Sequence, residues 1–130
     1  MIFSLLITGA PYSSQSVATA VQFAREALQQ GHTLHRVFFY ADAVHTGSKL
    51  ATPPQDEMHI PNEWQQLAKD NDLDLVVCIA AAVRRGVLDE GEAKRHEKPA
   101  GNLQDNYQLS GLGQLVEAAM ISDRMITFAP

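Results

Sequence analysis

The sequence predicts an α/β fold in which a parallel sheet of four to five strands is covered by helices on both faces. Short apolar runs alternate along the chain with segments of helical periodicity, the order expected of successive strand and helix units. The apolar runs are nearly continuous, as in strands buried on both faces. A chain of 130 residues also suits a single domain, residues 1–130, with a core of its own.

The first strand and helix are predicted from the beginning of the chain. Residues 1–8, MIFSLLIT, form a mostly apolar run that ends at Gly9 and Pro11. A helix is expected at 16–30, because Gly31 supplies a common C-terminal stop. Its apolar residues recur every three or four positions: Val17, Val21, Ala24 and Leu28.

A second strand and a long connection follow. The segment 32–40 contains the β-rich run RVFFY and is expected to be a strand. Residues 41–55 are expected to be irregular, because they contain a glycine and two prolines that discourage a helix. A connection of this length in a compact domain is more often functional than idle. Helical periodicity returns at Trp64, Leu67 and Ala68.

The second half of the chain repeats the alternation. A central strand is expected at 73–80, followed by a helical region at 81–95 that is interrupted by Gly86. The loop at 96–108 contains a possible short strand near 107–109. The SGLG run then opens a helix at about 114–122, and a last strand follows at 124–128.

Charge and composition exclude several classes of function. The net charge of −5 and the pI near 5.4 argue against a broad surface for nucleic acid, so no direct nucleic-acid partner is expected. Basic residues do gather after the third strand, where they either form a local docking site for anions or simply solvate a helix face. They are Arg84, Arg85, Lys94, Arg95 and Lys98.

The chain contains one cysteine, Cys78, which rules out an internal disulfide or a zinc site made of cysteines. A reducing, cytoplasmic location therefore fits. The five histidines are scattered, and no metal is expected. The apolar start is too short for a signal peptide or a membrane span, so no membrane partner is expected.

Cys78 is the candidate catalytic residue. Sites in parallel α/β sheets form beyond the carboxyl ends of the strands, and Cys78 lies near the end of the third strand. The small residues at 80–82 are expected to leave the sulfur reachable, and the start of the following helix would favour the thiolate. The alternative is that Cys78 is a small buried hydrophobe. No Cys-x-x-Cys partner or suitably spaced histidine suggests thioredoxin-like or protease-like chemistry.

The hydroxyl-rich turn at 8–14 is a second candidate site, because backbone N–H groups at the start of a helix can hold an anion or phosphate. It matches no phosphate-loop motif, and helix capping with turn formation is the favoured explanation. Ser110 in the SGLG run is likewise expected to cap the following helix.

Six segments fall in the order and spacing of the DsrE/TusD proteins, and the chain resembles this family over essentially its whole length. The segments are VFFY at 37–40, TPPQDE at 52–57, CIAAA at 78–82, RRG at 84–86, DE at 89–90 and SGLG at 110–113.

The resemblance implies a three-layer α/β/α fold and assembly with two related subunits into a heterohexamer. It also implies that the family's cysteine, here Cys78, receives persulfide sulfur from a small donor protein and passes it to an acceptor protein. In the TusD branch the sulfur ends in the 2-thiouridine of tRNA, and in the DsrE branch the complex serves dissimilatory sulfur oxidation. We expect tRNA thiolation, since it is the more widespread use of the family.

Two other classes of function stay open at this point. In a flavodoxin-like binding module, the turn at 8–14 and the strand-end crevice would hold a nucleotide or flavin, and Cys78 would be part of the core. In a structural subunit, a partner would carry the chemistry. The sulfur carrier itself needs no cofactor.

Overall fold

The computed structural model describes all 130 residues, and its centre is a five-stranded parallel sheet with the strand order β4-β3-β2-β1-β5. The sheet confirms the predicted α/β fold. The strands are β1 (Ile2–Ile7), β2 (Thr33–Phe39), β3 (Asp74–Cys78), β4 (Tyr107–Ser110) and β5 (Arg124–Phe128).

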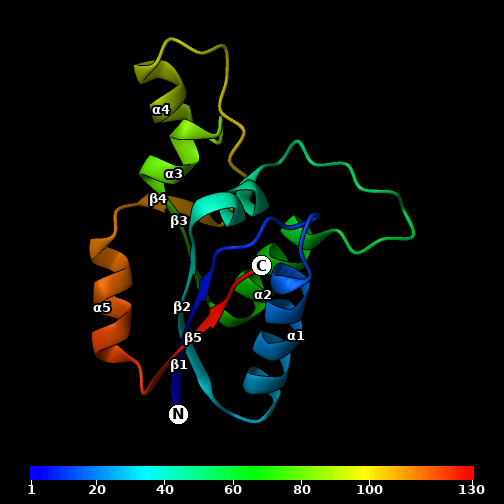
Figure 1. The fold of residues 1–130 in the computed structure, drawn as a ribbon, viewed down its shortest axis with the longest axis vertical. Coiled ribbons are helices and arrows are strands. Elements are labelled where there is room, and N and C mark those ends of the chain that lie inside the picture. Colours follow the sequence, from blue (N-terminus) through cyan, green and yellow to red (C-terminus); the bar gives the residue numbers. More distant parts are fainter.

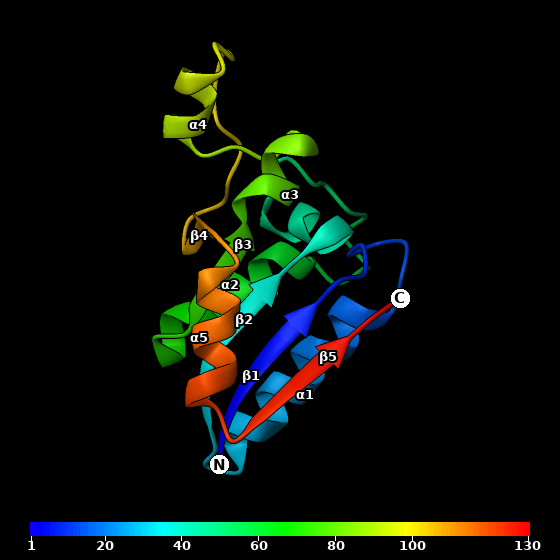
Figure 2. The same cartoon turned by 60° about the vertical axis from the view of Figure 1, so that its left-hand side comes forward.

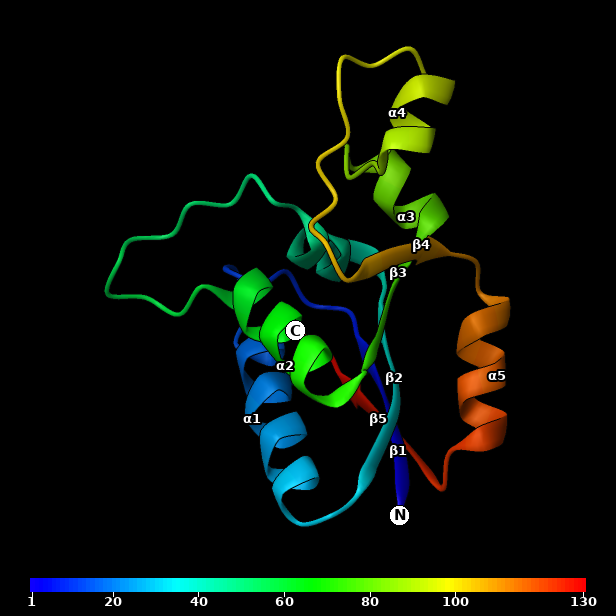
Figure 3. The same ribbon diagram turned by 180° about the vertical axis from the view of Figure 1, so that it is seen from behind.

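Helices cover both faces of the sheet, which gives the expected three layers. Figures 1 and 3 show α1 and α2 on one face and α5 on the other. The helices are α1 (Ser16–Gln29), the 3-10 helix η1 (Ala41–Gly47), α2 (Ile60–Asn71), α3 (Ile79–Arg84), α4 (Glu90–Arg95) and α5 (Gly113–Ile121). In Figure 2, α3 and α4 rise beyond the carboxyl ends of the strands, where sites of this fold class form.

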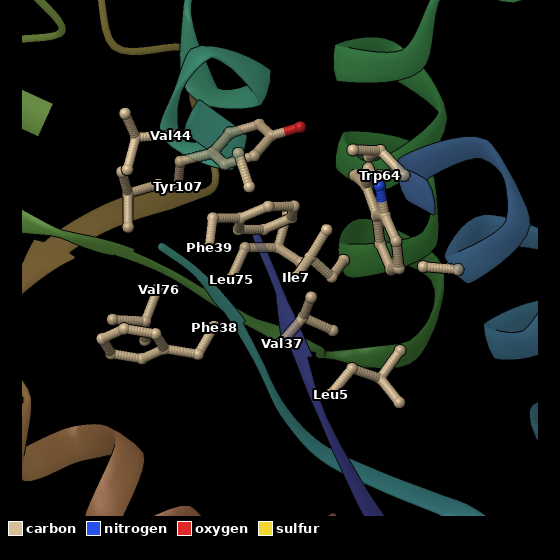
Figure 4. Packing of buried hydrophobic residues seen from close by; sticks show 14 of the residues in the cluster. Leu5, Ile7, Val37, Phe38, Phe39, Val44, Trp64, Leu75, Val76 and Tyr107 are labelled. Carbon is tan, nitrogen blue, oxygen red and sulfur yellow. The ribbon is translucent and has the colours of Figure 1, made fainter. Parts of the chain in front are cut away.

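The core on the α2 side is built by alternate residues of the strands. Leu5, Val37 and Leu75 point toward this side in Figure 4. Trp64 of α2 is fully buried and packs edge-on against Phe39, with ring centroids 5.7 Å apart. This packing fixes the helix over the sheet, since aromatic pairs add about 1 kcal/mol beyond the area that they bury.

The opposite face is held by a partly buried ion pair. Arg36 of β2 is only 7% exposed, and its Nε donates to Asp74 Oδ2 of β3 at 2.7 Å. Its Nη1 donates to the carbonyl oxygen of Gln114 at 2.8 Å. One side chain therefore ties two strands to the first turn of α5.

Three expectations for single elements need correction. The strand predicted at 73–80 ends at Cys78, and the helical region predicted from residue 81 begins at Ile79. Its predicted interruption at Gly86 is confirmed and divides it into two six-residue helices, α3 and α4. Gly86, with φ +76°, adopts a left-handed conformation between them that ends the first helix. The connection at 41–55 begins with η1 and is not wholly irregular. The short strand suspected near 107–109 is confirmed as β4.

Candidate active site at the carboxyl end of β3

Cys78 is the last residue of β3 and the residue directly before α3. It is in parallel register with Ser110, the last residue of the edge strand β4. The predicted position at the carboxyl edge of the sheet therefore holds. The two elements beside Cys78 are short: α3 has six residues and β4 has four.

The thiol is not exposed, which corrects the expectation that small neighbouring residues leave the sulfur reachable. Cys78 is 2% exposed and belongs to the hydrophobic core cluster. Ala81 and Ala82 are buried as well, because their small side chains allow α3 to pack closely against η1. The alanines thus close the structure around Cys78 instead of opening a path to it.

An ion pair fastens α3 in this position. Arg85 Nε donates to Asp42 Oδ1 of η1 at 2.9 Å, and Arg85 Nη1 donates to the carbonyl oxygen of Ala81 at 3.2 Å. Arg85 is therefore occupied with holding two elements together. It is not free to take part in the docking site for anions that the cluster of basic residues allowed.

An open pocket of about 520 Å³ lies on the outer side of α3. Its residues come from α3, from the turn after it and from the segment that follows α4: Ala80, Val83, Arg84, Gly86, Leu88, His96 and Lys98. No carboxylate lines it. The pocket joins the helix that begins next to Cys78 to a loop almost twenty residues further along the chain.

A second pocket, of about 500 Å³, lies at the hydroxyl-rich turn. The Tyr12 hydroxyl donates to the carbonyl oxygen of Met58 at 3.1 Å and accepts from the backbone N–H of Ile60 at 3.0 Å. Ser14 Oγ accepts from the backbone N–H of Ser16 at 3.1 Å. These bonds tie the turn to the segment before α2 and to Ser16, but no side chain caps the first turn of α1, so the expected capping is not observed.

Two local interpretations differ from the structure. Ser110 belongs to β4, and α5 begins after Leu112 without a side-chain cap. His59 was not predicted to have a capping role, yet its Nδ1 accepts from the backbone N–H of Asn62 at the start of α2. Its place two residues before Pro61 was the available signal, because proline favours the first turn of a helix.

Two general findings bear on the chemistry. No three side chains among the histidines, aspartates, glutamates and the cysteine come together in a way that would hold a metal ion. None of the helices combines the length and the apolar character needed to cross a membrane.

Known proteins resemble this chain over nearly its full length. The chain is 52% identical over 128 residues to a protein named putative sulfurtransferase DsrE from Allochromatium vinosum, which covers 98% of each chain. It is 45% identical over 128 residues to sulfurtransferase TusD from Cronobacter sakazakii, covering 98% of this chain and all of the relative.

A solved structure shares the fold. The crystal structure of the ychN protein from E. coli superposes with a TM-score of 0.75 over 98% of this chain and 100% of that one, at 20% identity. A model of the DsrE/DsrF-like family matches residues 1–128. The chain therefore belongs to the DsrE/DsrF-like family.

Proposed function

We propose that this protein is a sulfurtransferase subunit of a sulfur relay and that Cys78 carries the sulfur as a persulfide. The observation that carries the proposal is the position of the only cysteine, at the carboxyl end of β3, in a chain of this family. The relatives named sulfurtransferase support the activity.

The proposed reaction is an exchange between thiols that needs no external oxidant or reductant. The Cys78 thiolate attacks the outer sulfur of a donor persulfide, the donor's sulfur–sulfur bond breaks, and the donor leaves as a thiolate. An acceptor thiolate then attacks the outer sulfur of the Cys78 persulfide. That step releases Cys78 as a thiolate and leaves the sulfur on the acceptor.

Because Cys78 is 2% exposed, the reaction requires a local opening of the structure around it. The edge strand β4, of four residues, lies beside Cys78, and Gly111, Leu112 and Gly113 in the turn after it are exposed. Short edge elements of this kind open at a much lower free energy than the whole domain. We propose that this edge opens transiently in the free protein, which admits a small persulfide, and that the donor protein binds the edge and stabilises the opened state.

For the destination of the sulfur, we propose 2-thiouridine in tRNA, reached through an acceptor protein in the cytoplasm. Relatives named TusD support this branch. The 52% identity to the relative named DsrE favours dissimilatory sulfur oxidation as the second candidate. A chromosomal Cys78→Ser change separates the two: loss of 2-thiouridine from total tRNA supports the first, and intact tRNA with impaired sulfur oxidation supports the second.

We also propose that the chain works within a heterohexamer that contains two related subunits. The support is a stripe of exposed apolar side chains along α5. Leu112, Val116 and Met120 are 49%, 59% and 81% exposed and are spaced four residues apart, so they lie on one side of the helix. An apolar stripe of this kind is typical of a surface that a partner subunit covers.

The direct test is intact mass spectrometry after incubation with glutathione persulfide. We expect the folded protein to gain one sulfur atom that a reducing agent removes, and we expect Cys78→Ser to gain none. The variant is a clean control because the chain has no other cysteine. A wild-type protein that takes up sulfur only in denaturant would contradict the carrier, and a purified protein with bound flavin and an inert thiol would support the binding module instead.

A further inference from the structure

We infer that the pocket beside α3 recognises an acidic peptide segment of the protein that exchanges sulfur with Cys78. This inference rests on the proposed function, because it assigns the pocket to the same site. It concerns the charge of the partner, which the sulfur chemistry itself leaves open.

The first support is the pairing state of the basic side chains. Arg84 is the only arginine whose side chain makes neither an ion pair nor a hydrogen bond within the protein. Lys98, like the other lysines of the chain, has no acidic partner. Both line the pocket, so two cations are left unpaired around one hollow.

The second support is the contrast with the rest of the molecule. The chain carries a net charge of −5, yet no aspartate or glutamate lines this pocket. His96 also lines it, with Nε2 held at 3.2 Å from Glu92 Oε2. A local cluster of cations on an acidic protein attracts an oppositely charged partner and orients it.

The third support is the shape and lining of the pocket. Ala80, Val83 and Leu88 provide the apolar part of the wall beside the two cations. A volume of about 520 Å³ exceeds what a small inorganic anion needs and matches a few residues of peptide. A segment with carboxylates on either side of one apolar residue would satisfy both the charges and the wall.

The fourth support is the distance along the chain to the proposed nucleophile. Ala80, Val83 and Arg84 recur on one side of α3, the helix that begins directly after Cys78. A peptide held there would lie over the helix that covers the thiol. The pocket is therefore placed to hold the partner while its sulfur is exchanged.

The test is a titration of ¹⁵N-labelled protein with two synthetic peptides, acetyl-Glu-Glu-Leu-Ser-Glu amide and the same peptide with glutamine in place of each glutamate. Serine stands where a partner cysteine would be, so binding is measured without sulfur chemistry. We expect the acidic peptide to shift the amide signals of Ala80, Val83, Gly86 and Leu88. We expect it to bind about three- to tenfold more tightly than the glutamine peptide, as two exposed charge pairs allow.

Matched variants locate the effect. Arg84→Gln with Lys98→Gln should remove the preference for the acidic peptide, and Lys69→Gln on α2, an exposed lysine outside the pocket, should retain it. Equal affinity for both peptides, shifts confined to another surface, or equally tight binding of inorganic thiosulfate would overturn the inference. Sulfur uptake by Cys78 without peptide binding would refute the pocket alone, and peptide binding without sulfur uptake would refute the relay function.

Discussion

The hydroxyl group of Tyr107 makes the stability of the folded protein depend on pH. Tyr107 is 5% exposed, and its hydroxyl donates to the carbonyl oxygen of Pro61 at 2.8 Å. Burial raises the pKa of Tyr107 well above the ordinary value of 10.0, and the nearby phenol of Tyr12 raises it further. The unfolded chain therefore loses this proton at a lower pH than the folded protein does. The stabilising contribution of the neutral phenol is complete below pH 10 and is lost as the pH rises beyond that value.

We expect Tyr107→Phe to lower the free energy of unfolding by about 1 kcal/mol at neutral pH, because the Pro61 carbonyl loses its donor. Above about pH 10 the free energy of unfolding should fall less steeply with pH in the variant than in the wild type. The two slopes should differ by up to about 1.4 kcal/mol for each pH unit. Urea unfolding followed across this range measures both effects. Tyr40→Phe, at an exposed tyrosine, is the control and should follow the wild-type curve. Identical alkaline slopes for Tyr107→Phe and the wild type would refute the argument.

At the scale of elements, α4 and the segment after it are held together by close backbone contact. A Cβ atom at Gly101 would lie 2.7 Å from the carbonyl carbon of Asp89 and 2.9 Å from the backbone nitrogen of Glu90. Asn102 continues the contact, because its Oδ1 accepts from the N–H of Leu88 and its Nδ2 donates to the carbonyl oxygen of Gly86. Gly86 and Leu88 line the pocket beside α3, so the wall of that pocket depends on this contact.

We expect Gly101→Ala to destabilise the protein by about 1–3 kcal/mol, because the neighbouring atoms are backbone and cannot turn aside. It should also weaken binding of the acidic peptide. Gly91→Ala within α4 is the matched control, since the added Cβ would come no closer than 3.6 Å to another group. Alanine favours the helix, so this control should be neutral or more stable by up to about 1 kcal/mol. Equal unfolding midpoints for the two variants would argue against the close packing at Gly101.

The sequence predicts those elements whose pattern is local. The strands β1, β2 and β5 and the position of Cys78 at a strand end follow from short apolar runs. The sequence also predicts the interruption of 81–95 at Gly86, because glycine adopts a positive φ more readily than other residues. It does not predict the helix η1, which depends on a single backbone conformation, φ +51° at Ala41. The burial of Cys78 and the pocket beside α3 depend on segments that meet only in the folded chain, so the sequence offers a buried cysteine and a docking site for anions only as alternatives.

At the scale of the whole molecule, α5 presents two different sides. Its inner side is fastened to the sheet through the Arg36 bond to the Gln114 carbonyl oxygen, and Ala118 is fully buried. Its outer side leaves Val116 and Met120 in contact with water. Such side chains add nothing to the stability of the isolated subunit, so the stripe can be changed without unfolding it.

This difference allows assembly to be tested separately from folding. We expect Val116→Glu with Met120→Lys to leave the unfolding midpoint unchanged, because both side chains are exposed and the new charges form a favourable pair four residues apart. Native mass spectrometry of the tagged chain recovered from its own cells should show a six-subunit assembly for the wild type. The variant should appear as the free subunit, at 14.3 kDa plus the mass of the tag. Gln22→Glu with Glu26→Lys on the exposed side of α1 places the same pair elsewhere and should assemble normally. If the α5 variant is recovered in the full assembly, the stripe is not the subunit interface, because an interface of this kind cannot bury two charged side chains without partners.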